Sequence, residues 1–381
     1  MDINMSSKGL TPEQYAQRRF FNVFDFPLLG LALLLCAAGV AAIYSANLQS
    51  ESALMKSLYI RQLYWIALSL LAMAAAMMVD YRTLERFAYP LYSLGLMILG
   101  ATLITGRAAG GSRRWIGLAG VNFQPSEIMK IVLIIALARM FDDMMKKENL
   151  GAADLVKPGL LTLAPFLMVA AQPDLGTAMV LLFLFILTAF FNGLRRSFVA
   201  RVLGLMAMAA PAFWFLLKPY QQKRILTLLN PEGDPMGHGY HIIQSKIAIG
   251  SGGLWGKGIF MGTQSKLNFL PAKHTDFIFS VLAEEVGFFG AMALIAVFFI
   301  LILRMMEVMG MAKDKFGSLL VMGVAGMISF NFIFNIGMTM GLFPVVGIPL
   351  PFISYGGSAL IANFIGLGLI LNVSMGRFRL D

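Results

Sequence analysis

Charge, cysteine and histidine are all scarce in this chain of 381 residues. Only 13% of its residues are charged and 58% are hydrophobic, whereas about 25% are charged in a typical soluble domain. The single cysteine, Cys36, excludes an intramolecular disulfide and is most simply a small buried apolar side chain. His238, His241 and His274 lie outside any HExxH pattern, so zinc is at most weakly indicated. This composition predicts an integral membrane protein.

Long apolar runs dominate what is present. A membrane-spanning helix needs roughly 20 apolar residues, and lipid offers an open backbone no hydrogen-bond partners, so each crossing is expected to be helical. We count ten such segments: 27–48, 59–79, 88–105, 126–142, 158–172, 176–193, 198–217, 277–303, 317–341 and 355–374. The first 20 residues are polar, so no cleavable signal peptide is expected. We predict an all-α protein with a tail over residues 1–25 and one polytopic domain over 26–381.

The distribution of positive charge orients this domain. An even number of spans places both termini on one side, and most of the 30 Lys and Arg residues lie in the loops of that side, which is therefore predicted to be cytoplasmic. The predicted outer loops are 106–125, 218–276 and 342–354, with the large one between spans seven and eight. The first two are nevertheless basic. A long loop crosses regardless of its charge, but the short loop holds three arginines between positions 107 and 114.

The basic short loop suggests an outer site for an anionic ligand. Its sequence over 110–130 is GGSRRWIGLAGVNFQPSEIMK. Arg113 and Arg114 can each bind phosphate through two hydrogen bonds. Trp115 either stacks on a sugar or belongs to the interfacial aromatic belt. The net charge of +10 is no sign of nucleic-acid binding, because no motif for it is present.

Three further ionisable residues fall at the outer ends of predicted spans. Glu127 and Lys130 are spaced i, i+3 on one helix face. Because charge is costly there, they form either a self-satisfying pair or the wall of a wet cavity. Asp174, in the turn AAQPDLGTAMV, is either a helix cap or a residue facing that cavity.

The most concentrated polar cluster is LPAKHTDFIFSVLAEE, residues 270–285. Asp276 lies near a helix N-terminus, so it is either a cap residue or a catalytic carboxylate, and Lys273 and His274 adjoin it. Glu284 and Glu285 follow about 12 Å further along the helix, which indicates that this helix faces a polar interior.

The last outer loop is rich in proline and glycine over residues 341–364. Irregular backbone of this kind cannot face lipid, so we expect it to pack on the protein interior or to re-enter it. Asn331 and Asn335, spaced i, i+4 in the preceding helix, are candidates to hydrogen-bond to it.

Several long motifs occur in a fixed order along the chain. They are SRRWIGL (112–118), QPSEIMK (124–130), QPDLGT (172–177), NPEGDPMGHGYHIIQSKIAIGSGGLWGKG (230–258), LPAKHTDFIFSVLAEE (270–285) and GIPLPFISYGGS (347–358). Together they resemble the SEDS family of bacterial cell-wall polymerases, named for shape, elongation, division and sporulation. The resemblance runs from about residue 25 to the end. The stretch GTQSKLNFLP (262–271) is more similar to the elongation member of the family than to the division member.

The resemblance implies a ten-span peptidoglycan glycosyltransferase of the bacterial inner membrane. Its substrates would be lipid II and a growing glycan strand, and its partners a class B penicillin-binding protein, the elongation machinery and membrane lipids. By motif match the essential aspartate falls on Asp276, the cavity pair on Glu127 and Lys130, the loop residues on Arg114 and Trp115, and the acidic turn residue on Asp174.

The implied reaction explains this selection of residues. A sugar hydroxyl needs a positioned base, for which Asp276 is the candidate, and inverting transfer releases undecaprenyl diphosphate. Arg114, Lys130 and Lys273, with His274 beside them, would stabilise the diphosphate. A divalent cation, Mg or Mn, is a further candidate, and no organic cofactor is expected. The alternatives are a transporter that flips the same precursor and a scaffold for a partner enzyme.

Overall fold

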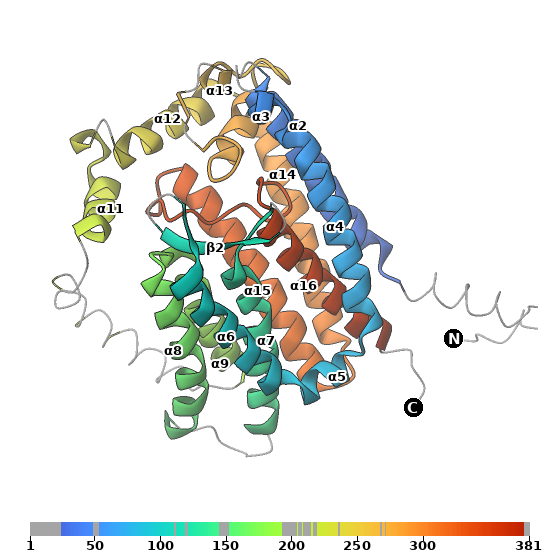
Figure 1. Ribbon diagram of the computed structural model, residues 1–381. Coiled ribbons are helices and arrows are strands. Elements are labelled where there is room, and N and C mark those ends of the chain that lie inside the picture. Colours follow the sequence, from blue (N-terminus) through green and yellow to red (C-terminus); the bar gives the residue numbers. More distant parts are fainter. Residues whose placement is uncertain are drawn as a thin grey trace, which may run out of the picture.

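The computed structural model is mostly helical (Figure 1). It describes residues 24–48, 53–109, 112–118, 121–144, 152–192, 219–234, 237–266, 269–270 and 272–376, together with the single positions 204, 208 and 215. Nine of the ten predicted spans correspond to helices in these ranges. The remaining predicted span, 198–217, lies outside the described residues except at those single positions, so the count of ten stays a prediction.

Seven described helices are long and apolar enough to cross a membrane. Two others match predicted spans: α7 carries several charges, and α9 is a shorter apolar helix. The nine helices are α2 (Phe26–Asn47), α4 (Leu58–Met78), α6 (Ala88–Thr105), α7 (Pro125–Met144), α8 (Val156–Ala171), α9 (Leu175–Phe191), α14 (Ile278–Gly310), α15 (Lys315–Thr339) and α16 (Gly357–Gly376).

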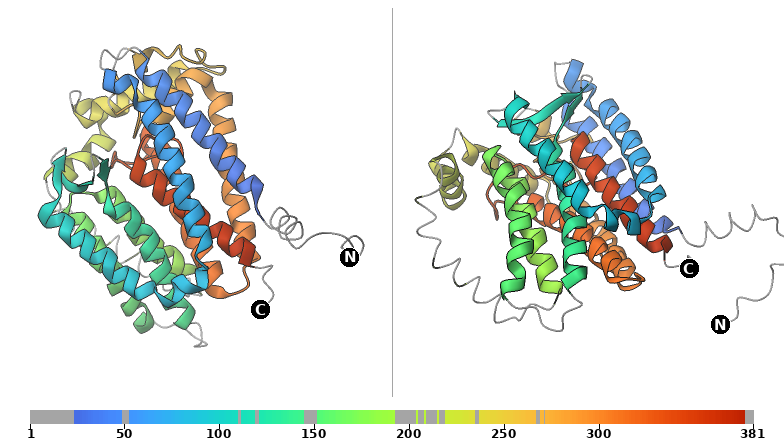
Figure 2. Two further views of the ribbon diagram at one scale, coloured as in Figure 1. Left: turned by 45° about the vertical axis from the view of Figure 1, so that its right-hand side comes forward. Right: turned by 60° about the horizontal axis from the view of Figure 1, so that its bottom comes forward.

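The centre of the bundle is formed by α15 and α16. Most of each is buried inside the protein, whereas α4 and α6 are largely exposed, as expected of lipid-facing helices. Figures 1 and 2 place α2 and α4 along one side of this centre and α6, α8 and α9 along the other. The buried side chains form one continuous apolar core that includes Phe141, Phe298, Phe316, Phe352 and Phe364.

The two ends of the bundle differ in structure. One end carries a small antiparallel sheet, β1 (Arg107–Ala109), β2 (Ser112–Leu118) and β3 (Val121–Phe123), in the order β1-β2-β3. It also carries α11 (Pro219–Leu229), the short 3-10 helix η2 (Pro231–Gly233), α12 (His238–Ser251) and α13 (Thr263–Lys266). We call it the sheet end, and include in it α3 (Ala53–Lys56) and the segment 341–356. The sheet and these helices were not predicted from the sequence.

The opposite end holds α5 (Tyr81–Arg86) and η1 (Ala152–Leu155). Asp25, before α2, binds Arg304 in the last turns of α14. Asn372, near the end of α16, donates to the carbonyls of Met77 and Val79 at the end of α4. The first described helix therefore begins, and the last one ends, at the same end of the bundle.

The proline-rich segment 341–356 packs on the protein interior, as predicted, with most of residues 345–354 buried. Gln62 Nε2 donates to the carbonyl of Ser354 (3.3 Å), and Asn335 Nδ2 donates to that of Ile348 (2.7 Å). A Cβ on Gly39 would lie 2.5 Å from the backbone oxygen of Ile353, so α2 can approach this segment only because residue 39 is glycine. Two carbonyls of this irregular backbone thus find hydrogen-bond partners on neighbouring helices.

Candidate functional site at the sheet end

Strand β2 directs Arg114 toward the start of α9. The Nη1 atom of Arg114 lies 3.8 Å from Oδ2 of Asp174. Trp115 is the next residue, so its side chain points to the other face of the strand, where it is partly exposed. The side chain of Arg113, the second predicted phosphate ligand, lies outside the described part of the structure.

Asp174 has the first of the two roles that its sequence context allows, that of a helix cap, and a position facing a cavity stays a prediction. As the N-cap of α9 it accepts hydrogen bonds from the backbone N–H (3.2 Å) and the hydroxyl (3.0 Å) of Thr177. Its Oδ2 also accepts a hydrogen bond from Gln124 Nε2 (2.7 Å) and faces Arg114. A buried carboxylate thus connects α9, the residue before α7 and strand β2.

Glu127 and Lys130 pair directly on the first turns of α7. Lys130 Nζ lies 2.8 Å from Glu127 Oε2, and both side chains are almost completely buried. Two desolvated charges in contact stabilise each other, but each would be costly alone. The structure therefore shows the self-pairing expected from the spacing, while direct contact with substrate stays a prediction.

The turn that holds Asp276 is fixed through its backbone. The hydroxyl of Ser354 donates to the carbonyl of Thr275 (2.7 Å), and the backbone N–H of Tyr355 donates to that of His274 (2.9 Å). Asn335 Nδ2 donates to the carbonyl of Asp276 (3.0 Å). Asp276 itself is not the cap of α14, because the N-cap position is Phe277 and no side chain caps this helix.

The carboxyl of Asp276 is partly buried between oppositely charged groups. Burial raises its pKa to about 6, and the Asp174 charge adds to this rise. The Arg114 charge, the Thr275 hydroxyl and the Arg224 charge act against it. The charges of Arg114 from β2, Arg224 from α11 and Asp174 before α9 therefore all act on the same carboxyl. A base whose pKa lies near the working pH is suited to proton transfer.

Lys273 and His274 complete the cluster on the same turn. Lys273 is buried, which lowers its pKa. Burial also lowers the pKa of His274, and the Lys273 charge lowers it further. The His274 ring meets the ring of Tyr355 edge-on, with centroids 5.9 Å apart.

Two nitrogen atoms of this cluster have no hydrogen-bond partner among the described residues. They are Nε of Arg114 and Nδ1 of His274, and both are buried. Buried polar atoms in proteins are nearly always satisfied by protein, water or ligand. The arrangement can therefore still accept hydrogen-bonding groups from a bound molecule.

The two glutamates of α14 face other partners. Glu284 accepts hydrogen bonds from Lys257 and Thr263, and Glu285 accepts one from Ser45 on α2. The predicted polar surroundings of this helix are present, but they consist of protein groups at the sheet end.

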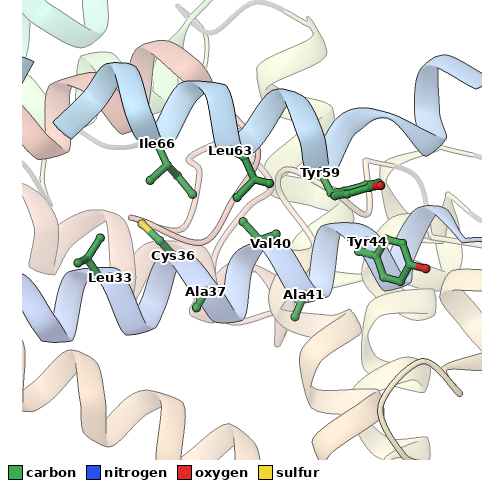
Figure 3. A pocket seen from close by; sticks show the side chains of 9 residues that line it. All are labelled: Leu33, Cys36, Ala37, Val40, Ala41, Tyr44, Tyr59, Leu63 and Ile66. Carbon is green, nitrogen blue, oxygen red and sulfur yellow. The ribbon is translucent and has the colours of Figure 1, made fainter. Parts of the chain in front are cut away.

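The described residues contain no group of three or more His, Cys, Asp or Glu that could hold a metal ion. A cation carried by the diphosphate of a substrate stays a prediction. The groove in Figure 3, with a volume of about 500 Å³, lies between α2 and α4 and is lined by apolar side chains and two tyrosines. It contains none of the predicted site residues, and buried Cys36 is one of its lining residues, as the apolar interpretation requires.

The comparisons with known proteins define the class of this chain. Residues 27–378 match the model of the FtsW/RodA/SpoVE family, described as cell cycle proteins. The chain therefore belongs to this family of multi-pass membrane proteins.

Individual relatives match over nearly their whole length. The chain is 42% identical to the peptidoglycan glycosyltransferase MrdB of Escherichia coli over 93% of this chain and 94% of that protein. It is 33% identical to the peptidoglycan glycosyltransferase RodA of Treponema pallidum, covering 92% and 97%. It is 37% identical to a probable peptidoglycan glycosyltransferase FtsW of Trichlorobacter lovleyi, covering 93% of each.

Solved structures agree with this assignment. A chain from a peptidoglycan synthase complex, studied for its coordination of polymerization and crosslinking, superposes with a TM-score of 0.80 at 36% identity, covering 93% of this chain and 99% of that one. The rod shape determining protein RodA of Thermus thermophilus superposes with a TM-score of 0.69 at 31% identity, covering 93% and 98%.

Arg224 and Gln124 are site residues that sequence reasoning missed. Arg224 lies in a long basic loop with no fixed spacing to Asp276, and only the folding of α11 brings it close. Gln124 begins the motif QPSEIMK, which also contains Glu127 and Lys130. Its place in that motif was the one sequence feature that could have indicated a site residue.

Proposed function

We propose that this chain polymerises lipid II into glycan strands, with Asp276 as the general base. Its family and the names of its relatives establish the coarser class: a peptidoglycan glycosyltransferase in the bacterial inner membrane. Lipid II is a disaccharide-pentapeptide carried on undecaprenyl diphosphate. The sheet end would face outward, where the predicted outer loops lie, and the similarity to MrdB and RodA supports a role in cell elongation.

The observation that carries the mechanism is the position of the Asp276 carboxyl among Arg114, Arg224 and Asp174. The reaction joins the 4-hydroxyl of one sugar to the anomeric carbon of another. A neutral hydroxyl is a poor nucleophile, and a carboxylate that accepts its proton in the transition state overcomes this. With a pKa of about 6, Asp276 is mostly ionised at pH 7 and still basic enough to accept a proton.

The cations of the site serve the leaving group. Undecaprenyl diphosphate departs as an anion, so it needs positive charge where negative charge develops. Arg114 is the best-placed donor, because its Nε has no partner among the described residues. Lys273 adds charge next to the candidate base, and a divalent cation on the diphosphate would add more.

A partner transpeptidase belongs to this proposal. The structural neighbour from a peptidoglycan synthase complex supports pairing of a polymerase with a crosslinking enzyme, which for this chain would be a class B penicillin-binding protein. The names of the relatives favour a polymerase over the transporter and scaffold hypotheses.

Purified protein with lipid II, with and without a class B penicillin-binding protein, tests the proposal. Wild type is expected to form glycan polymer on a gel. Asp276→Asn, shown to be folded and partner-bound, is expected to lose activity by about a thousandfold, because the amide cannot accept the proton. Equal polymer from both would move the search for the base to Asp174 or Glu127. No polymer from folded, partner-bound wild type would contradict polymerisation itself.

A further inference from the structure

Helix α14 is broken near its beginning. Gly287 has φ 67° and ψ −167°, which is not helical, and it divides α14 into an outer half, residues 278–286, and a main half, residues 288–310. The main half is about 35 Å long at 1.5 Å per residue, enough to cross the roughly 30 Å hydrocarbon core. The outer half is therefore an addition at the sheet end, next to Asp276.

The glycine-rich segment 252–258 fills this break. The backbone N–H groups of Lys257 and Gly258 donate to the carbonyls of Glu284 and Glu285, both at 3.0 Å. The N–H groups of Phe288 and Phe289 donate to the carbonyls of Gly253 (2.9 Å) and Leu254 (3.2 Å). The helix ends exposed by the break thus find their hydrogen-bond partners in one segment.

The contact allows no side chains at two glycines. A Cβ on Gly256 would lie 2.1 Å from the carbonyl oxygen of Glu285, and one on Gly287 would lie 2.2 Å from the backbone nitrogen of Gly256. Both glycines also have positive φ. The close contact therefore explains why the segment GSGGLWGKG has glycine at position 256.

Glu284 and Lys257 form an ion pair where the segment 252–258 meets the outer half of α14. Glu284 is fully buried, and its Oε1 accepts hydrogen bonds from Lys257 Nζ (2.7 Å), from the backbone N–H groups of Thr263 (2.7 Å) and Gln264 (3.0 Å), and from the Thr263 hydroxyl (3.0 Å). A buried carboxylate with this many donors strongly prefers one geometry. The segment from 252 to 264 is thereby held to the outer half of α14.

The outer half continues directly into the turn that carries the site. Residues 272–277 precede it, and they include Lys273, His274 and Asp276. The hydroxyls of Ser280 and Ser245 are hydrogen-bonded (2.7 Å), which joins the outer half to α12 as well. Arg114 and Asp174 stand on β2 and α9, outside this unit. The placement of Asp276 relative to them therefore depends on how the outer half is held, together with the hydrogen bonds from Ser354, Tyr355 and Asn335 to the turn.

We propose that Lys257 and Glu284 are positioning residues for the reaction. They hold the outer half of α14, and through it they aim the Asp276 carboxyl toward Arg114 and the substrate. Neither residue touches the reacting groups. The inference rests on the proposed function, and it predicts an effect on the chemical step rather than on substrate affinity.

The test compares Glu284→Gln, Lys257→Met and the exchanged pair Lys257→Glu with Glu284→Lys, each with its partner transpeptidase. Asp25→Asn is the matched control, because it breaks the Arg304–Asp25 ion pair at the other end of the same helix. For lipid II polymerisation, each single variant is expected to lower kcat between about tenfold and a hundredfold, since small misplacements of a catalytic group cost this much. KM should stay within about twofold, and the exchanged pair should recover part of kcat.

Hydrogen exchange gives a readout that does not need activity. In both single variants exchange should accelerate at 253–264 and also at the turn 272–277, whereas in Asp25→Asn these segments should exchange as in wild type. Faster exchange confined to 253–264, or a raised KM with normal kcat, would overturn the positioning role.

The exchange data also separate this inference from the proposed function. If folded wild type makes no polymer, faster exchange at 272–277 in the variants still supports the mechanical link, and unchanged exchange there refutes it. Gly287→Ala offers an independent disruption of the same junction and should accelerate exchange in the same two segments.

Discussion

Charged residues at the two ends of the bundle behave differently. At the opposite end, arginines on the protein surface meet nearby carboxylates: Arg139 with Asp143 (3.0 Å), and Arg82 with Asp314 (3.7 Å). At the sheet end, Glu127, Lys130, Asp174, Lys273 and Glu284 are all buried.

This difference indicates that the charged residues at the two ends have different roles. Surface ion pairs contribute little to stability and are easily replaced by water, so the exposed pairs at the opposite end are expected to tolerate substitution. Buried Asp25, which pairs with Arg304, is an exception at that end. Buried charges are costly to keep and are retained where they serve a particular arrangement. At the sheet end Arg114, Arg224 and Asp174 act on the Asp276 carboxyl, whereas Glu127 pairs with Lys130 and Glu284 with Lys257.

The largest expected effect comes from breaking the buried pair on α7. Glu127→Gln should destabilise the protein by about 3–5 kcal/mol, because Lys130 is left as a buried unpaired charge. The double variant Glu127→Gln with Lys130→Met should lose less. Thermal unfolding in detergent measures both. Equal melting temperatures for wild type and the single variant would mean that the pair is hydrated.

Removing the arginine beside the candidate base should have the next largest effect. Arg114→Gln deletes a charged hydrogen-bond donor, and such a bond contributes about 1.5–3 kcal/mol. We expect kcat/KM for lipid II to fall at least tenfold. Because the Arg114 charge holds the pKa of Asp276 down, the pH profile should also shift to higher pH. An unshifted profile would show that Arg114 does not act on this carboxyl.

The pH dependence of the wild type should show the base directly. Asp276 has a pKa of about 6, so kcat/KM should be level above this pH and fall about tenfold per unit below it as the carboxylate becomes protonated. Titration of Asp276 should have the opposite effect on stability. Its pKa in the folded state exceeds the ordinary value, so its contribution to stability falls as pH rises from about 4 to 6. Asp276→Asn should therefore melt at a higher temperature than wild type at pH 7.

The smallest effect is expected at the opposite end. Arg82→Gln removes a surface ion pair with Asp314 and should change stability by less than about 1 kcal/mol. Glycan polymerisation should be unaffected. A large loss of polymerisation in Arg82→Gln would contradict the view that only charges at the sheet end serve the reaction.

Much of the bundle follows from the sequence, because a membrane span must be long, apolar and helical. The bounds of α2, α4 and α6 agree with the predicted segments to within a residue. The residue pattern did not predict the short elements outside the membrane spans. Strand β2 reads SRRWIGL, without clear alternation, and α11 and α12 were hidden in a long polar loop.

Several residues of the candidate site could be named from the sequence, but Arg224, Gln124 and the contacts between the residues could not. Asp276, Asp174 and Arg114 could be named from motifs, yet their mutual placement depends on packing between distant segments. Glu284 shows the limit most clearly. Its position in an apolar helix indicated that this helix faces a polar interior, but its partner Lys257 lies 27 residues earlier in the chain, and no residue pattern specifies that pairing.

Because the single thiol, that of Cys36, is buried, the chain should react little with thiol-labelling reagents. A water-soluble maleimide should not reach a side chain that is 2% exposed, so a cysteine introduced elsewhere would report alone. Leu229→Cys on α11 should react in intact cells, whereas Glu307→Cys at the opposite end should react only after the cells are opened. The same labelled positions could then carry probes for distance measurements, without any cysteine having to be removed first.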